Sequence, residues 1–236
     1  MGQKVRVHIP NAITSCNLIS GCIAVVYALN AIYSMALLFI IIGALFDFFD
    51  GMSARLLKVS SPIGKELDSL ADDVTFGVAP ASMLFSILLT NPLPHFVAPI
   101  SQWIPYLAYL MAAFSALRLA NFNLDVRQAT SFIGLPTPAN ALFWGGIIVG
   151  CQGIISSNPW FPLGLLILSF VSCALLVSGI PMFALKFKSY GWKGNEIKYL
   201  FIISCIPILL IFRTVGISIV IAWYVVLSVI MSFRKS

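Results

Sequence analysis

The sequence is poor in charge, in histidine and in paired cysteines. Charged residues make up 9% of the 236-residue chain, which has two histidines and five cysteines. The cysteines form no CxxC pair and have no histidine cluster nearby, which excludes zinc-finger and thiol-redox motifs and leaves packing as their expected role. No basic segment interleaved with aromatic residues is present either. Nucleic acid is therefore not an expected partner.

Long apolar runs take the place of charge. Hydrophobic residues make up 60% of the chain, against roughly 45–50% in soluble domains. This predicts an all-α, polytopic integral membrane helical bundle, a single transmembrane domain over residues 1–236 with a short N-terminal interfacial segment, 1–10. Arg213 is expected to mark the turn between the last two spans. About eight transmembrane helices are expected from apolar length, near residues 11–30, 34–57, 65–90, 98–121, 138–155, 160–181, 197–212 and 214–232.

The positive charges are distributed unevenly over the predicted loops. With an even number of spans and the amino terminus inside, all of the 14 lysines and arginines except Arg213 fall on the cytoplasmic side. Such a bias indicates orientation in the bilayer. We therefore predict a multi-pass protein of the inner or cell membrane, with both termini and the connection at 58–64 on the cytoplasmic side. The net charge of +6 then reflects orientation and contact with anionic lipids.

Most of the acidic residues lie in one window. Six of the eight are found there: Asp47, Asp50, Glu66, Asp68, Asp72 and Asp73. Asp47 and Asp50 are three residues apart, and Asp68 and Asp72 are four apart, so each pair lies on one face of a helix. Two such faces in contact would form a cage of four carboxylates, whose repulsion predicts bound divalent cations. Oxygen ligands favour Mg²⁺ or Mn²⁺. Asp73 is one residue off this face, and we interpret it as a structural contact.

Small residues share the faces of these aspartates. Gly51 and Ala54 lie on the surface of the first pair, and Gly64 precedes Asp68 by four residues. Residues this small leave room either for a flat ligand or for a close approach of two helices. Arg55 adds a positive charge beside them. The segment Ser60–Pro62 is expected to end one helix before the next begins.

The order of these residues resembles the signature of the CDP-alcohol phosphotransferase family. The pattern is Asp47, two residues, Asp50-Gly51, two residues, Ala54-Arg55, eight residues, Gly64, three residues, Asp68, three residues and Asp72. The resemblance implies attack of an alcohol on the β-phosphate of a CDP-linked substrate, with release of CMP. It implies two divalent ions held by Asp47, Asp50, Asp68 and Asp72, with Asp72 also accepting the proton of the alcohol. It further implies contacts to the CDP substrate from Gly51, Ala54, Arg55 and Gly64, and a homodimer.

Two further stretches resemble the bacterial and archaeal phosphatidylserine synthase branch of that family. One begins at Arg118 and reads Arg-Leu-Ala-Asn-Phe-Asn, and the other begins at Phe132 and reads Phe-Ile-Gly-Leu-Pro-Thr-Pro-Ala. An arginine inside a membrane helix costs about 2.5–3.5 kcal/mol at the centre and less near an end. Arg118 is therefore either an interfacial anchor or a phosphate contact, and we favour the second. Asn121 stands where many members of the branch carry arginine, which leaves the acceptor alcohol open.

The first span carries a third pattern of this branch. Asn11, Thr14 and Asn17 follow Pro10 at three-residue intervals. Polar side chains at this spacing either cap the helix or bond a neighbouring helix. Their resemblance to the Pro-Asn, Thr, Asn pattern of phosphatidylserine synthases implies a contact to the nucleotide side of the substrate instead. Both interpretations remain open at this point.

The resemblance implies a specific reaction, with two alternatives. The expected reaction transfers the phosphatidyl group of CDP-diacylglycerol to the hydroxyl of L-serine and yields phosphatidylserine and CMP, the activity classified as EC 2.7.8.8. The nearest alternative uses glycerol 3-phosphate or an inositol compound as acceptor at the same site. A divalent-cation transporter is an alternative of another class, because intramembrane carboxylates also mark ion paths. Against it, the acidic residues gather at one face of the predicted membrane.

Overall fold

The fold is all-α, as the sequence predicts. The computed structural model describes residues 2–125, 132–183, 191–192 and 195–235. In chain order the elements are α1 (Gly2–Leu29), α2 (Tyr33–Leu57), α3 (Pro62–Asp72), the π-helix η1 (Asp73–Val78), α4 (Ala79–Thr90), the 3₁₀ helices η2 (His95–Ile100) and η3 (Ile104–Tyr109), α5 (Leu110–Leu124), β1 (Phe132–Ile133), α6 (Thr137–Gly150), α7 (Gln152–Ser157), α8 (Trp160–Leu176), β2 (Pro181–Met182) and α9 (Glu196–Lys235).

Several of the helices have the length and composition of membrane spans. Within the described residues, 5 helices meet both criteria: His8–Leu29, Tyr33–Leu57, Pro62–Thr90, Ile104–Leu124 and Glu196–Phe233. The apolar helices α6 and α8 are shorter, at 14 and 17 residues. The structure therefore supports a membrane protein, while the count of about eight spans stays a prediction. The predicted turn at Arg213 is confirmed, since its φ of 49° and ψ of −123° interrupt α9.

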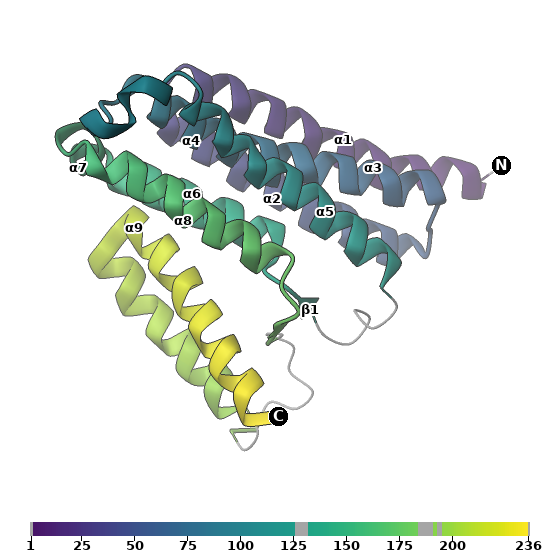
Figure 1. Cartoon of the computed structure of the whole chain (residues 1–236). Coiled ribbons are helices and arrows are strands. Elements are labelled where there is room, and N and C mark those ends of the chain that lie inside the picture. The colour runs from purple at the N-terminus through teal and green to yellow at the C-terminus, as the bar shows by residue number, and fades with distance from the viewer. Residues whose placement is uncertain (1, 126–131, 184–190, 193–194, 236) are drawn as a thin grey trace.

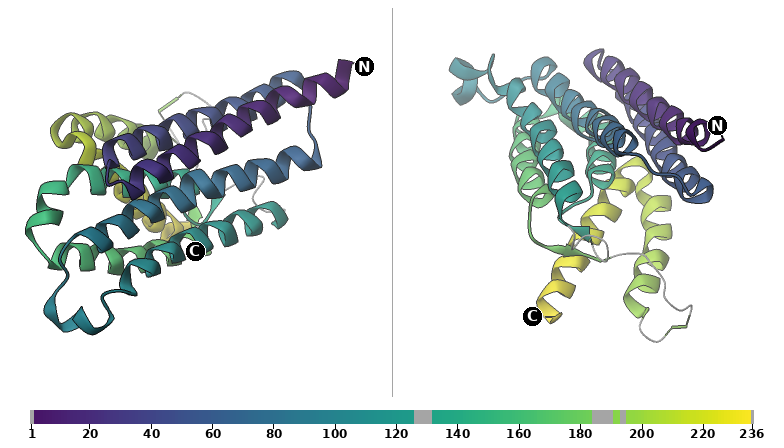
Figure 2. Two further views of the ribbon diagram at one scale, coloured as in Figure 1. Left: turned by 90° about the horizontal axis from the view of Figure 1, so that it is seen from above. Right: turned by 90° about the vertical axis from the view of Figure 1, so that its right-hand side faces the viewer.

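The helices run back and forth between two ends of the bundle (Figure 1). The amino terminus, the connection from α2 to α3, the end of α5 and the carboxyl terminus lie toward one end, on the right and lower side of the view. The connection from α4 to α5, helix α7 and the bend of α9 lie at the opposite end. The two arms of α9 project below the other helices (Figure 2, right), and α9 packs mainly against α6. The cytoplasmic assignment of the first end stays a prediction.

Three predicted segments differ in detail from the structure. The start of the predicted span 98–121 is not α-helical, because His95–Ile100 and Ile104–Tyr109 are 3₁₀ helices, the first of which contains Pro99, a residue without a backbone N–H. Helix α6 ends at Gly150, earlier than the predicted 155, and α7 begins two residues later. Helix α1 continues through Pro10 from Gly2, so the segment 1–10 does not form a separate element. Its expected position at the membrane interface stays a prediction.

The connection between α2 and α3 brings the two aspartate pairs together. Lys58 ends α2 in the left-handed conformation, with φ of 52° and ψ of 43°. Ser61 caps α3 by accepting a hydrogen bond from the Gly64 N–H at 3.0 Å, and Pro62 is the first helical residue. Serine before the helix and proline at its first position are both favoured there. The chain thus reverses direction within a few residues, as predicted for Ser60–Pro62, and sets α3 on an antiparallel course to α2.

Candidate metal and nucleotide site

Three aspartates from α2 and α3 converge near the connection between these helices. Asp47, Asp50 and Asp68 each offer one carboxylate oxygen, and these oxygens lie within 4.8 Å of one another. Asp50 is buried, and the other two are half-buried. Asp68 Oδ1 is buried without a hydrogen-bond partner in the described part of the chain. A buried carboxylate oxygen is costly to leave unpaired. This donor set therefore fits a hard divalent cation such as Mg²⁺ or Mn²⁺.

Asp72 lies beside the triad formed by Asp47, Asp50 and Asp68. It is not among the aspartates whose oxygens fall within 4.8 Å of one another. Its Oδ1 accepts a hydrogen bond from Asn17 Nδ2 at 3.1 Å, and it interacts electrostatically with Asp47 and Asp68. The structure thus brings three of the four predicted ligands together and holds the fourth next to them. The assignment of Asp72 as a metal ligand and as the base stays a prediction.

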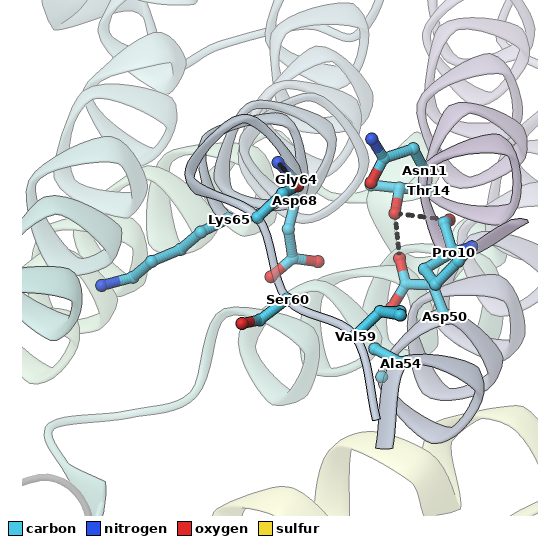
Figure 3. A pocket seen from close by; sticks show the side chains of 12 residues that line it. Pro10, Asn11, Thr14, Asp50, Ala54, Val59, Ser60, Gly64, Lys65 and Asp68 are labelled. Atoms are coloured by element: carbon cyan, nitrogen blue, oxygen red, sulfur yellow. Dashed lines mark hydrogen bonds between the residues drawn. The ribbon is translucent and has the colours of Figure 1, made fainter. Parts of the chain in front are cut away.

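Helix α1 supplies the hydrogen bonds that hold two of these carboxylates. Thr14 Oγ1 donates to Asp50 Oδ2 at 2.6 Å and also lies 3.0 Å from the Pro10 carbonyl oxygen (Figure 3). Asn17 makes the equivalent contact to Asp72. Thr14 and Asn17 thus bond residues of neighbouring helices, which is one of the two sequence interpretations, and their contact to the nucleotide stays a prediction. Both side chains are buried against the aspartates.

A pocket of about 310 Å³ opens beside the triad (Figure 3). Its lining comes from the first half of α1, the end of α2, helix α3 and the connection between α2 and α3: Pro10, Asn11, Thr14, Asp50, Gly51, Ala54, Val59, Ser60, Ser61, Gly64, Lys65 and Asp68. A Cβ atom at Gly51 would meet nothing within 4 Å, so this glycine leaves room for a ligand. A Cβ at Gly64 would lie 2.9 Å from Asn11 Oδ1, so that glycine allows α3 to approach α1. Gly51 thus has the first role expected of small residues, room for a ligand, and Gly64 has the second, close approach of two helices.

The two arginines predicted at the site lie outside this pocket. Arg55 is exposed, and its Nε donates to the Gly51 carbonyl oxygen at 2.9 Å. Arg118 is buried, with its guanidinium carbon 5.1 Å from the centroid of the Phe122 ring. Its Nε has no hydrogen-bond partner in the described residues, and its charge interacts with Asp72. Arg118 lines a second pocket of about 430 Å³, together with Asn121. The buried, unsatisfied Nε is consistent with a site for an anionic group.

Several lining residues carried no prediction of a site role. Ser60, Ser61 and Lys65 line the first pocket, although Lys65 Nζ turns away and donates to the Asn123 carbonyl oxygen at 3.0 Å. Their place in the polar segment between the two aspartate pairs was the available signal in the sequence. Asp73, interpreted as a structural contact, belongs to none of the described metal-ligand groups and faces Gly77 on its own helix.

Comparison with known proteins establishes the family. Residues 7–232 match the family model described as CDP-alcohol phosphatidyltransferase. The chain belongs to this family, which confirms the resemblance drawn from the aspartate motif.

Three curated relatives carry the name CDP-diacylglycerol–serine O-phosphatidyltransferase. The Bacillus subtilis protein is 40% identical over 131 residues, which cover 56% of this chain and 70% of the relative. The Mycobacterium tuberculosis protein is 33% identical over 183 residues, 74% of this chain and 60% of the relative. The Methanocaldococcus jannaschii protein is 36% identical over 196 residues, 76% of this chain and 88% of the relative. The match to the mycobacterial protein thus spans less than two thirds of its length.

Proposed function

We propose that this protein transfers the phosphatidyl group of CDP-diacylglycerol to the hydroxyl of L-serine, yielding phosphatidylserine and CMP. Family membership and the shared name of the relatives support the reaction and the acceptor. The observation that carries the chemistry is the convergence of Asp47, Asp50 and Asp68 within 4.8 Å at the edge of a pocket. Such a cluster can hold cations against a diphosphate, as two-metal phosphoryl-transfer sites do.

The residues around the pocket would hold different parts of CDP-diacylglycerol. Asp47, Asp50, Asp68 and Asp72 would hold two Mg²⁺ or Mn²⁺ ions. When bound, such ions neutralise charge on the attacked phosphate and on the departing CMP. Gly51 and Ala54 leave space in the pocket for the cytidine, and Asn11 and Gly64 lie at its edge as further contacts. Arg55, at the surface, would meet a phosphate only by turning away from the Gly51 carbonyl.

The transfer itself requires a base and a positive charge. The serine hydroxyl oxygen forms a bond to the β-phosphorus as the bond from that phosphorus to the CMP oxygen breaks. The hydroxyl proton would pass to the carboxylate of Asp72, whose Oδ1 accepts a hydrogen bond from Asn17 Nδ2. The charge of Arg118 interacts with that of Asp72, and Arg118 would bind an anionic group of a substrate. Such positioning is the main contribution a protein makes to phosphoryl transfer.

The membrane accounts for how the donor reaches the site. Large apolar side chains on α2 are exposed beside the aspartates, namely Leu45, Phe48 and Phe49. In a bilayer these side chains would face lipid, so the acyl chains of CDP-diacylglycerol can stay in the hydrocarbon while its head group enters the pocket. We also propose that the site and both termini face the cytoplasm, where the basic segments are expected, and that the protein forms a homodimer, as the family resemblance implies.

The acceptor is tested with purified protein in detergent or liposomes. CDP-diacylglycerol is supplied with radiolabelled serine, glycerol 3-phosphate or inositol phosphate, and both lipid product and CMP are measured. We expect serine alone to yield labelled lipid. Labelled lipid from another acceptor instead would overturn the serine assignment and keep the reaction class. Divalent-cation uptake into liposomes without CMP release would favour the transporter alternative.

The metal-cage mechanism is tested by Asp68→Asn. The substitution removes one of the converging carboxylates with little change in shape, and we expect CMP release to be abolished. Glu66→Gln is the matched control, because Glu66 lies exposed on the same helix and loses the same charge. Chelation by EDTA should stop the reaction in the wild type, and added Mg²⁺ or Mn²⁺ should restore it. Substantial CMP release by purified Asp68→Asn protein would remove the mechanism.

A further inference from the structure

Thr75 follows Asp72 in a helical turn of unusual geometry. Residues Asp73–Val78 form a π-helix, and the Ala79 N–H bonds the Val74 carbonyl oxygen five residues back. A π-turn inserts an extra residue into a helix, changes the direction of the side chains around it, and is frequent at functional sites. The turn begins directly after Asp72. The direction of the Asp72 carboxylate therefore depends on how this turn is held.

Thr75 bonds the main chain of α1 across a gap left by glycine. Its side chain is fully buried, and its Oγ1 donates to the Asn17 carbonyl oxygen at 3.1 Å. That carbonyl already faces the N–H of Gly21, one helical turn along α1. A Cβ at Gly21 would lie 2.8 Å from Thr75 Cα and would collide with Thr75 Oγ1. The hydroxyl reaches the carbonyl because residue 21 has no side chain.

A second glycine, on α2, completes the fit around Thr75. A Cβ at Gly43 would collide with the Thr75 methyl group and lie 2.9 Å from Asn17 Oδ1. Gly43 comes four residues before Asp47, so this contact also sets the distance between η1 and the helix that carries two of the triad aspartates. Thr75 thus lies where α1, α2 and η1 meet, three residues after Asp72.

Asn17 therefore holds the segment 72–75 at both ends. Its side-chain amide donates to Asp72 Oδ1 at 3.1 Å, and its main-chain carbonyl accepts from Thr75. One bond would leave the segment free to rotate about its contact, whereas two bonds to the same residue restrict both rotation and sliding of η1 along α1. The Asp72 carboxylate is held in one direction as a result.

We propose that Thr75 is a positioning residue for Asp72: its hydroxyl anchors the π-turn to α1 and thereby aims the Asp72 carboxylate at the triad. The proposal rests on the proposed function only in giving Asp72 a part in metal binding and proton transfer. Residues that orient a ligand typically affect metal affinity or activity by about 10–100-fold. The alternative is a packing role, in which Thr75 only fills the space between the two glycines.

Two substitutions separate these roles. Thr75→Val keeps the branched shape and removes the donor, whereas Thr75→Ser keeps the donor and removes the methyl group. A packing role predicts that serine is the more damaging change, and a positioning role predicts that valine is. Thr75→Cys, with a weakly donating thiol, is expected to fall between the two and serves if the valine variant does not fold.

The experiment measures Mn²⁺ binding by the purified protein in detergent, from the electron paramagnetic resonance signal of free Mn²⁺. We expect Thr75→Val to weaken Mn²⁺ binding and lower kcat by about 10–100-fold, with the KM for CDP-diacylglycerol unchanged, and Thr75→Ser to behave as the wild type. Ser86→Ala is the control, because it removes another buried hydroxyl, 3.1 Å from the Tyr33 hydroxyl and away from the triad. It should keep the wild-type Mn²⁺ affinity.

Two outcomes would overturn the proposal. One is wild-type Mn²⁺ affinity and kcat in Thr75→Val, and the other is an equal or larger loss in Thr75→Ser. A double mutant gives an independent test, since Asn17→Ser removes the amide bond to Asp72 and should leave little further effect for Thr75→Val. Mn²⁺ binding is measured in the absence of substrate, so this test does not depend on phosphatidylserine being the product. A wild-type protein that binds Mn²⁺ and makes no phosphatidylserine would refute the proposed function and leave this test intact.

Discussion

Gly21→Ala is expected to damage the site without touching any aspartate. The added Cβ would lie 2.8 Å from Thr75 Cα and 2.9 Å from Thr75 N. Ordinary van der Waals contact begins at 3.4 Å, so α1 and η1 must separate by about 0.6 Å, and the obstacle is backbone that cannot rotate aside. Overpacking of this kind costs about 1–3 kcal/mol of stability. A displacement of about 1 Å at a catalytic group can cost about 10²-fold in rate, so we expect a loss of tenfold or more.

The assay combines CMP release with thermal unfolding in detergent. Gly164→Ala, in α8, is the matched control, because a Cβ there would meet nothing within 4 Å. It should keep full activity and be as stable as the wild type or more stable, since alanine is favoured over glycine in a helix interior by about 1 kcal/mol. Wild-type activity and stability in Gly21→Ala would refute the close packing of α1 against η1 and the reasoning built on it.

Two further predictions concern other positions. Thr14→Val removes the donor to Asp50 and should raise the Mg²⁺ concentration for half-maximal activity by about 10–100-fold. Ser15→Ala, which removes a hydroxyl that donates to the Asn11 carbonyl oxygen within α1, should leave this concentration unchanged, and equal Mg²⁺ curves for the two variants would contradict the prediction. At Arg213, whose φ is 49°, Arg213→Gly should leave the melting temperature unchanged or higher, and Arg213→Val should lower it, because a β-branched residue resists a positive φ. The reverse order of melting temperatures would argue against a left-handed backbone conformation at the bend of α9.

Local patterns in the sequence predicted the elements that depend on neighbouring residues. The helix break at Ser60–Pro62 follows from capping and proline geometry, which act within a few residues, and the structure has it at the expected place. The bend at Arg213 follows from length, because the apolar run is too long for one straight span. The 3₁₀ turns over 95–109 were missed, since an apolar run with prolines allows either a disrupted helix or a loop.

The candidate site likewise has features that follow from local sequence and features that follow from tertiary contacts. The sequence by itself determined that Asp47 and Asp50 share one helix face, that Asp68 and Asp72 share another, and that the chain is a membrane protein, because helical periodicity and hydropathy are local properties. Only the tertiary structure decided that Asp68 joins the first pair while Asp72 bonds Asn17. The distance between helices depends on how closely their backbones approach, and that approach is set by contacts between residues far apart in the chain.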